Sequence, residues 1–286
     1  MNFGARFAIS RNTQFYNFWR FKSTNSLTNV SFNNQVKTIT LSNPNGRNVL
    51  SIPMQKELLT NLSADWDNKD LRVIVLDAKG PIFSAGHDLQ EMTAKNDNKT
   101  FQEIFKLAND IMTAIVQCPV PVLAKVTGGA YAAGCQLVAQ CDIAICTPKS
   151  KFATPGVNAG IFCATPSVPV TRCTNQMTAR YMLFTGMPLT AKEALANGLV
   201  FKVCEEEDID KEVDNICNSI IAKSRAIIMN GKRFYYKQVC LPLDEAYKLG
   251  AKEMVNTLSL KDTQEGVNSF LEKRKPKWQH NTDPVN

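Results

Sequence analysis

Two glycine-containing segments decide how this chain folds, and they read Phe83-Ser84-Ala85-Gly86-His87-Asp88-Leu89 and Gly128-Gly129-Ala130-Tyr131-Ala132-Ala133-Gly134-Cys135-Gln136-Leu137. Each follows an apolar run, and the second continues into a helical pattern. Small residues at a junction between strand and helix leave backbone N–H groups free to face a ligand. Two converging N–H groups form an oxyanion hole, which stabilises negative charge on a carbonyl oxygen.

Around these segments, apolar runs alternate with helical patterns. We expect strands at 36–41, 73–76, 120–126 and 143–146, and helices at 53–69, 100–118 and 136–141. The run Val73-Ile74-Val75-Leu76 is continuously apolar and predicts a strand covered on both faces. The alternation predicts an α/β fold with its site at the strand ends.

The C-terminal half changes character and becomes mainly helical after Thr185. Thr190 and Glu193 match a capping box, and Gly198 follows that short helix. Longer helices are expected at 208–223, 225–239, 243–258 and 261–274. The polar tail from Lys275 onward is expected to be loose.

The N-terminal segment is basic and lacks acidic residues. No Asp or Glu precedes Glu57, while Arg6, Arg11, Arg20 and Lys22 alternate with aromatic and aliphatic residues. This composition is typical of a mitochondrial presequence, so we expect a location in the mitochondrial matrix. The alternative is a solvated basic arm.

Charge and composition exclude several classes of protein. Removing the four N-terminal cations lowers the net charge from +7 to +3, which argues against a dedicated nucleic-acid binder but suits an anionic ligand. There is no apolar run long enough to span a membrane. The nine cysteines form no Cys-x-x-Cys pair and only two histidines accompany them, so we expect buried reduced thiols and no metal site.

Several ordered motifs resemble the crotonase (enoyl-CoA hydratase/isomerase) superfamily, and within it a mitochondrial subgroup. The matching segments are 83–89, 128–142, 185–194, 198–200 and 265–276. The resemblance implies a crotonase-like ββα spiral with a helical C-terminal trimerisation region, and assembly into homotrimers or hexamers. The expected organisation is a presequence and loose N-terminus at 1–30, a spiral core at 34–220 and the helical region at 221–286.

The resemblance also implies the ligand and the residues that hold it. The ligand is an acyl-CoA thioester, with coenzyme A as part of the substrate and no separate cofactor. By position, the oxyanion donors are the backbone N–H groups of His87 and Ala133; many relatives have glycine at the second position. The other residues expected to border the thioester or the coenzyme are Ala85, Asp88, Leu89, Gln90, Arg47 and Lys273.

This chain departs from the family at both catalytic carboxylates. Family hydratases use two glutamates as base and acid, and these positions are Gln136 and Gly156 in this sequence. Of the nearby polar residues, only Cys163 is a conceivable base, if its pKa is perturbed. Each lost acid–base group typically costs about 10²–10⁴-fold in rate, so efficient hydration is not expected.

Several residue roles stay open on the sequence alone. The His87 imidazole is either catalytic or incidental to its backbone role, and Gln136 either binds the ligand or satisfies the helix end. Asp88 and Asp142 are interpreted as structural, with Asp142 bonding local backbone N–H groups.

Three functions remain in competition. The first is an acyl-CoA-binding, hydratase-like protein of fatty-acid metabolism with little or no hydratase activity. The second is a decarboxylase of a malonyl-type CoA thioester, which needs no base; some family decarboxylases share the histidine before Asp88. The third is a non-catalytic acyl-CoA sensor or an inactive subunit.

Overall fold

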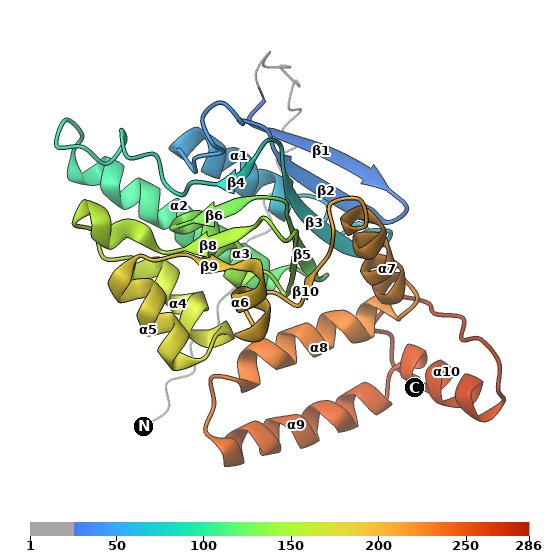
Figure 1. Ribbon diagram of the computed structural model, residues 1–286. Helices are drawn as coiled ribbons and strands as arrows, with labels where there is room; N and C mark the ends of the chain where they lie inside the picture. Colours follow the sequence, from blue (N-terminus) through green and yellow to red (C-terminus); the bar gives the residue numbers. More distant parts are fainter. Residues whose placement is uncertain (1–25, 286) are drawn as a thin grey trace.

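Two β-sheets form the core of the molecule, for which a computed structural model describes residues 26–285 (Figure 1). The predicted presequence lies almost entirely outside the described residues. The larger sheet has the order β1-β2-β3-β5-β7-β10, and the smaller has the order β4-β6-β8-β9. The strands of the larger sheet are β1 (Thr28–Asn33), β2 (Val36–Leu41), β3 (Val73–Ala78), β5 (Val122–Val126), β7 (Ile143–Cys146) and β10 (Lys202–Val203). Those of the smaller are β4 (Ile82–Ser84), β6 (Gly129–Tyr131), β8 (Lys151–Ala153) and β9 (Leu189–Thr190).

From β3 to β8 the chain winds so that successive strands alternate between the two sheets. Helix α2 (Asn98–Gln117) returns the chain from β4 to β5 and α3 (Ala133–Gln140) returns it from β6 to β7, whereas β8 is followed by β9 of the same small sheet before α6 (Ala191–Ala196) leads to β10. All pairings are parallel except β1 with β2 and β8 with β9. This is the ββα spiral predicted from the sequence, and the prediction is confirmed.

The continuous apolar run of β3 is buried on both faces, as expected. Ile74 and Leu76 belong to the main core cluster, whereas Val73 and Val75 pack in a second cluster with helix α7 (Ile209–Ile221). Side chains of a strand alternate between its faces, so an apolar residue is needed at every position.

Helices cover the spiral and delimit its loops. They are α1 (Ile52–Ser63), α2 (Asn98–Gln117), α3 (Ala133–Gln140), the 3₁₀ turn η1 (Pro155–Ala159), α4 (Ala164–Cys173), α5 (Gln176–Thr185) and α6 (Ala191–Ala196). The predicted capping box at Thr190 and Glu193 is present, with both reciprocal hydrogen bonds. The helix predicted at 53–69 is shorter than expected because Ala64 is extended, with φ −72° and ψ 151°. Trp66 lies beyond it and still donates from Nε1 to the Leu62 carbonyl, at 2.7 Å.

The C-terminal region adds α8 (Arg225–Gln238), α9 (Leu243–Leu258) and α10 (Lys261–Leu271). Helices α8 and α9 run side by side below the spiral (Figure 1). Lys232 of α8 fastens this region to the core, because its Nζ lies 2.6 Å from the carboxylate of Asp142, before β7. The same ammonium donates to the carbonyls of Ile115 and Val120.

Two sequence-based expectations about the chain ends are wrong. Residues 28–30 are not a loose N-terminus, since they belong to β1, which pairs along its whole length with β2. The C-terminal tail is fastened as well: the Asp262 carboxylate accepts from the N–H groups of Gln279 and His280, at 2.7 and 2.9 Å. The Lys261 N–H donates to the Asp283 carbonyl at 3.0 Å. A buried carboxylate thus orders a segment that has no helical or strand pattern of its own.

Candidate functional site

The two glycine-containing segments meet at the carboxyl ends of β4 and β6, which are parallel neighbours. A Cβ atom added to Gly86, whose φ is +91°, would lie 2.9 Å from the Tyr131 carbonyl oxygen and 3.1 Å from the Ala133 nitrogen. A Cβ added to Gly134 would lie 2.4 Å from the carbonyl oxygen of Ser84. The loops touch backbone to backbone at these positions, and only glycine allows the approach.

Two backbone N–H groups are free where the loops touch. Ala133 is the first residue of α3, and Ala132 before it has φ 49° and ψ −118°, a conformation that is costly for a residue with a side chain. Within residues 26–285, neither the His87 nor the Ala133 N–H donates a hydrogen bond. Free donors at a helix N-terminus attract negative charge. The arrangement fits a carbonyl oxygen that becomes an oxyanion.

The His87 imidazole is packed into the protein. Its ring meets the ring of Phe105, on α2, edge to face at 5.4 Å between centroids. Both ring nitrogens are buried and have no hydrogen-bond partner among the described residues. Burial lowers the pKa of His87 below the ordinary histidine value, and the Leu50 backbone opposes this shift. Burial thus favours the neutral form of the imidazole.

Gln136 and Gly156, the two positions where the resemblance places the family glutamates, carry no carboxylate. Gln136 lies on α3 and is 4% exposed, and its Oε1 has no partner among the described residues. Gly156 lies in η1, where an added Cβ would be 2.4 Å from the Ile161 carbonyl oxygen and 2.8 Å from Cys163 Sγ. The Ile161 N–H donates to the Gly156 carbonyl at 2.9 Å, which closes the turn tightly. Position 156 therefore has no room for a longer side chain in this backbone.

The polar groups near these positions do not replace the missing base. Thr154 is fully buried and its Oγ1 has no partner in the described chain; the preceding residue, Ala153, accepts from the Ala132 N–H at 2.9 Å. Burial raises the pKa of the Cys163 thiol, although the Gly156 backbone lowers it slightly. A thiol with a raised pKa stays protonated at neutral pH, so the conceivable role of Cys163 as a base is not supported.

Some of the residues expected around the thioester are held by hydrogen bonds within the loops, and others have exposed side chains. Ala85 lies beside the Arg47 loop, because its N–H donates to the Arg47 carbonyl at 3.0 Å. The Arg47 side chain is exposed, as are Leu89 and Gln90. Asp88 Oδ1 accepts from the Gln90 N–H at 3.0 Å, which is the structural role expected of it.

Asn48, in the loop expected to border the coenzyme, has a structural role that sequence reasoning did not identify. It is fully buried with φ 49°, and its amide donates to the carbonyls of Lys79 and Ile82 at 2.9 and 2.8 Å. Its Oδ1 accepts from the Asn43 N–H at 2.8 Å. An asparagine within a Pro/Gly turn is a signal for such a role, since asparagine tolerates positive φ and bonds backbone groups. Asn48 holds the Arg47 loop against the strand that leads to His87.

Two other predicted residues lie away from the loops. Lys273 follows α10 and is separated from β4 and β6 within the single chain (Figure 1). Asp142 is structural, but its partners are not local: Val122 N–H, Lys232 Nζ and Tyr236 Oη lie 2.7, 2.6 and 2.9 Å from its carboxylate.

The thiols, the possible metal ligands and the hydropathy of the helices complete the description of the site and its surroundings. All nine cysteines have free thiols, of which six are buried. Within residues 26–285 no group of three His, Cys, Asp or Glu side chains could hold a metal ion. In that same part of the chain, no helix is both long and apolar enough to cross a bilayer. The two free N–H groups can hold a carbonyl oxygen and favour an enolate, and neither Gln136 nor Gly156 carries a carboxylate.

Known proteins with similar sequences and structures share the fold described above. Residues 31–281 match the family described as Enoyl-CoA hydratase/isomerase. The human "Enoyl-CoA hydratase domain-containing protein 3, mitochondrial" is 47% identical over 250 residues, which cover 87% of this chain and 82% of the human protein. The rat protein of the same name is 45% identical over 254 residues, covering 89% and 85%. The crystal structure of the human protein superposes with a TM-score of 0.87 and 45% identity, covering 88% of this chain and 100% of that one.

These relatives confirm two sequence-based predictions. The mitochondrial subgroup recognised in the motifs is the one to which the human and rat proteins belong, and both carry the mitochondrial location in their names. The assignment of this chain to mitochondria is confirmed on that basis.

Proposed function

The chain belongs to the enoyl-CoA hydratase/isomerase family, and from that premise we propose that it binds acyl-CoA thioesters in a backbone oxyanion hole while hydrating enoyl-CoA very poorly. The donors are the N–H groups of His87 and Ala133. The ligand is an acyl-CoA of mitochondrial fatty-acid metabolism, and coenzyme A is part of it.

One observation carries the binding half of this proposal. The position of a Cβ on Gly86 lies 3.1 Å from the Ala133 nitrogen, and both neighbouring N–H groups are unbonded within residues 26–285. Buried or half-buried N–H groups are normally satisfied, so two free donors side by side favour a ligand oxygen between them. A thioester carbonyl supplies that oxygen.

The catalytic half rests on the two replaced carboxylates. Hydration needs a base to activate water and an acid to protonate the α-carbon. Gln136 carries no titratable proton, and the Gly156 turn leaves no room for a side chain. If each group contributes about 10²–10⁴-fold, their joint loss removes about 10⁴–10⁸-fold while the hole remains.

Binding is tested by calorimetric titration with short and long acyl-CoA thioesters, using free coenzyme A as the control. We expect saturable binding that weakens when the thioester is absent. Failure of every thioester to bind at millimolar concentration would contradict the proposal.

A decarboxylase of a malonyl-type thioester is the second candidate, and one observation favours it. Gln136 and Thr154 carry no charge, and burial favours the neutral forms of His87 and Cys163, so these four residues do not repel a ligand carboxylate. The C–C bond to the carboxylate would break, CO₂ would leave, and the electron pair would form an enolate held by the two N–H groups. A proton from solvent then completes the product. Release of CO₂ from malonyl-CoA and methylmalonyl-CoA tests this reaction, and binding without release favours a non-catalytic sensor or an inactive subunit.

The assembly we propose is a homotrimer or hexamer built on the C-terminal helices. Tyr247, Val255, Phe270 and Leu271 of α9 and α10 are 69–82% exposed. Large apolar side chains left exposed on both helices favour an interaction surface there. Light scattering at micromolar concentration should give a trimer or hexamer mass, and a stable monomer would refute it.

The proposal includes removal of the N-terminal presequence on import. The first 22 residues carry four cations and no anion. Sequencing the N-terminus of the protein isolated from mitochondria should find a start downstream of Lys22, and an intact Met1 in that fraction would contradict cleavage.

A further inference from the structure

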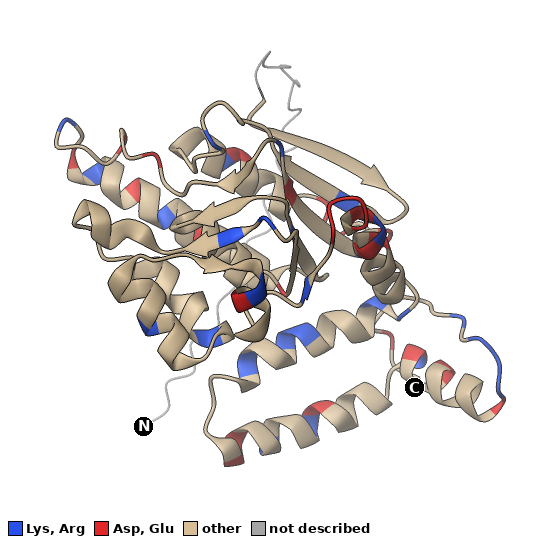
Figure 2. Cartoon of the chain, viewed as in Figure 1, with Lys and Arg blue, Asp and Glu red and all other residues tan. Residues whose placement is uncertain are grey.

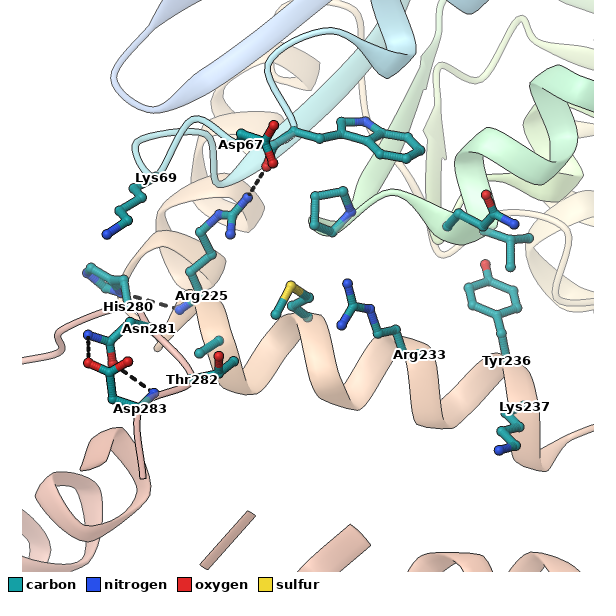
Figure 3. Close-up of a pocket in the computed structure, with 16 residues that line it drawn as sticks. Asp67, Lys69, Arg225, Arg233, Tyr236, Lys237, His280, Asn281, Thr282 and Asp283 are labelled. Atoms are coloured by element: carbon teal, nitrogen blue, oxygen red, sulfur yellow. Dashed lines mark hydrogen bonds between the residues drawn. The ribbon is translucent and has the colours of Figure 1, made fainter. Parts of the chain in front are cut away.

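A second cavity, of about 810 Å³, lies between the spiral and the C-terminal region (Figure 3). Helix α8 forms its floor, and the turn after α1, the end of α2 and the fastened C-terminal tail form its walls. Its side chains include Trp66, Met229, Arg225, Arg233, Tyr236 and His280. This volume is typical of pockets that bind small organic molecules.

The cavity is distant from the oxyanion hole. It adjoins Pro119 and Trp66, before the amino ends of β5 and β3, whereas the glycine loops lie at β4 and β6, which come after the carboxyl ends of β3 and β5. A strand of this length spans roughly 20 Å at about 3.3 Å per residue. The two sites therefore lie at opposite ends of the strands, and the cavity is not part of the acyl-CoA cleft.

The cavity contains an excess of positive charge. Arg225 and Arg233 project from α8 toward the core (Figure 3), and α8 has no acidic residue (Figure 2). Within residues 26–285, neither arginine lies within 4.0 Å of a carboxylate. Arg225 is only 9% exposed and gives two of its N–H groups to the carbonyls of Leu71 and Trp66.

A second buried guanidinium, that of Arg72, adds positive charge beside His280. Arg72 is 3% exposed, donates to the Lys223 carbonyl, and lies 3.3 Å from His280 Nε2. The Asp262 carboxylate nearby is already used by Ser224 Oγ and two backbone N–H groups. Burial, and then the charges of Arg72 and Arg225, lower the pKa of His280, with Asp262 opposing. The cations in and beside the cavity outnumber its carboxylates, which are Asp67, Asp283 and the nearby Asp262, so the cluster keeps a net positive charge that favours an anion.

We propose that this cavity binds an organic phosphate of nucleotide size. The phosphate meets Arg225 and Arg233, since guanidinium groups bind phosphate oxygens in a bidentate fashion. Trp66, Pro119 and Met229 line the remaining volume and suit a planar or apolar body rather than a bare ion. Asp67 and Asp283 also line the cavity and disfavour a second anionic group near them.

ADP is the probe for the test, with inorganic phosphate and adenosine as its separate parts. Titration of the full-length protein is followed by calorimetry and by the fluorescence of Trp66, with Trp66→Phe identifying that signal. Because ADP is also a fragment of coenzyme A, the titration is repeated with saturating acyl-CoA. We expect ADP to bind in both cases, more tightly than phosphate or adenosine.

The decisive variant is Arg233→Gln, because Arg233 is exposed and has no bonded partner whose loss would disturb the fold. The matched control is Arg180→Gln, an exposed arginine on α5. Loss of one charge-assisted contact should weaken ADP binding about 10- to 100-fold in Arg233→Gln and leave Arg180→Gln unchanged. Absence of ADP binding at millimolar concentration, equal affinity for phosphate and ADP, or equal binding by both variants would each overturn the proposal. None of these results depends on whether the thioester binds in its own cleft.

Discussion

A Cβ atom on Gly156 would lie 2.4 Å from the carbonyl oxygen of Ile161, so this turn has no space for a longer side chain. The backbone of η1 has closed over the position, with the Ile161 N–H bonded to the Gly156 carbonyl.

The first prediction is that Gly156→Glu does not restore hydration and destabilises the protein. Overpacking of this kind costs about 1–3 kcal/mol. Gly231→Glu is the matched control, because nothing lies within 4 Å of a Cβ at that position. Thermal unfolding should show a lower Tm for Gly156→Glu alone. An equally stable Gly156→Glu with a large gain in hydration would mean that the turn reopens easily.

The second prediction concerns the buried ion pair between Lys232 and Asp142, with side-chain exposures of 6% and 15%. Lys232→Met removes the cation that pairs with the Asp142 carboxylate and the donor to two backbone carbonyls, which should cost about 3–5 kcal/mol. Lys248→Met, in the exposed pair with Asp244, should cost less than about 1 kcal/mol. Denaturant unfolding of the two variants measures the difference. Similar values would mean that the buried pair does not fasten α8 to the core.

The third prediction separates the backbone of His87 from its side chain. His87→Ala keeps the N–H and should keep thioester binding, whereas Ala133→Pro removes a donor. A bound 3-ketoacyl thioester reports the difference, because an oxyanion hole favours its enolate, which absorbs in the near ultraviolet. Loss of one donor should lower the enolate equilibrium about 10²–10³-fold, by analogy with its effect on rate.

Circular dichroism and oligomer mass control for the fold of Ala133→Pro, although proline is tolerated at the first position of a helix. The opposite pattern, with enolate lost in His87→Ala and retained in a folded Ala133→Pro, would assign the role to the imidazole.

The fourth prediction is a loss of stability at acid pH that depends on His87. Burial lowers its pKa in the folded protein, so the unfolded chain binds the proton more tightly. The stabilising contribution is complete above the unfolded value of about 6.5 and is lost as the pH falls toward the folded pKa. The slope should be at most about 1.4 kcal/mol per pH unit. Unfolding of His87→Gln should show a smaller dependence between pH 7 and pH 5, and an unchanged dependence would contradict this assignment.

Much of this fold follows from residue patterns that physical rules can interpret. The four-residue apolar run of β3 required a strand with two covered faces, and Thr190 with Glu193 required a helix start. The elements between Lys151 and Pro188 could not be predicted from the residue pattern, because Pro166 and Pro169 lie within α4 and interrupt its helical periodicity. The docking of the tail depends on the Asp262 carboxylate, which lies on a different helix, and no local pattern encodes that contact.

The site was predictable where small residues determine it. Gly86 and Gly134 are required by close backbone approach, which the glycine-rich segments indicated. The closure of η1 over Gly156 was not predictable, since the atom that fills the space is a backbone carbonyl and every residue has one. The raised pKa of Cys163 follows from burial, which agrees with the buried reduced thiols expected from the sequence.

The measurement that tests the central claim most directly combines binding and turnover in one sample. The purified protein is titrated with a four-carbon enoyl-CoA, and formation of the 3-hydroxyacyl product is followed by mass spectrometry under saturating conditions. We predict saturable binding with a turnover at least about 10⁴-fold below the typical enzyme value of about 10 s⁻¹. Turnover near 10 s⁻¹ would show that another group supplies the base, and would contradict the conclusion that Gln136 and Gly156 leave the site without its acid–base pair.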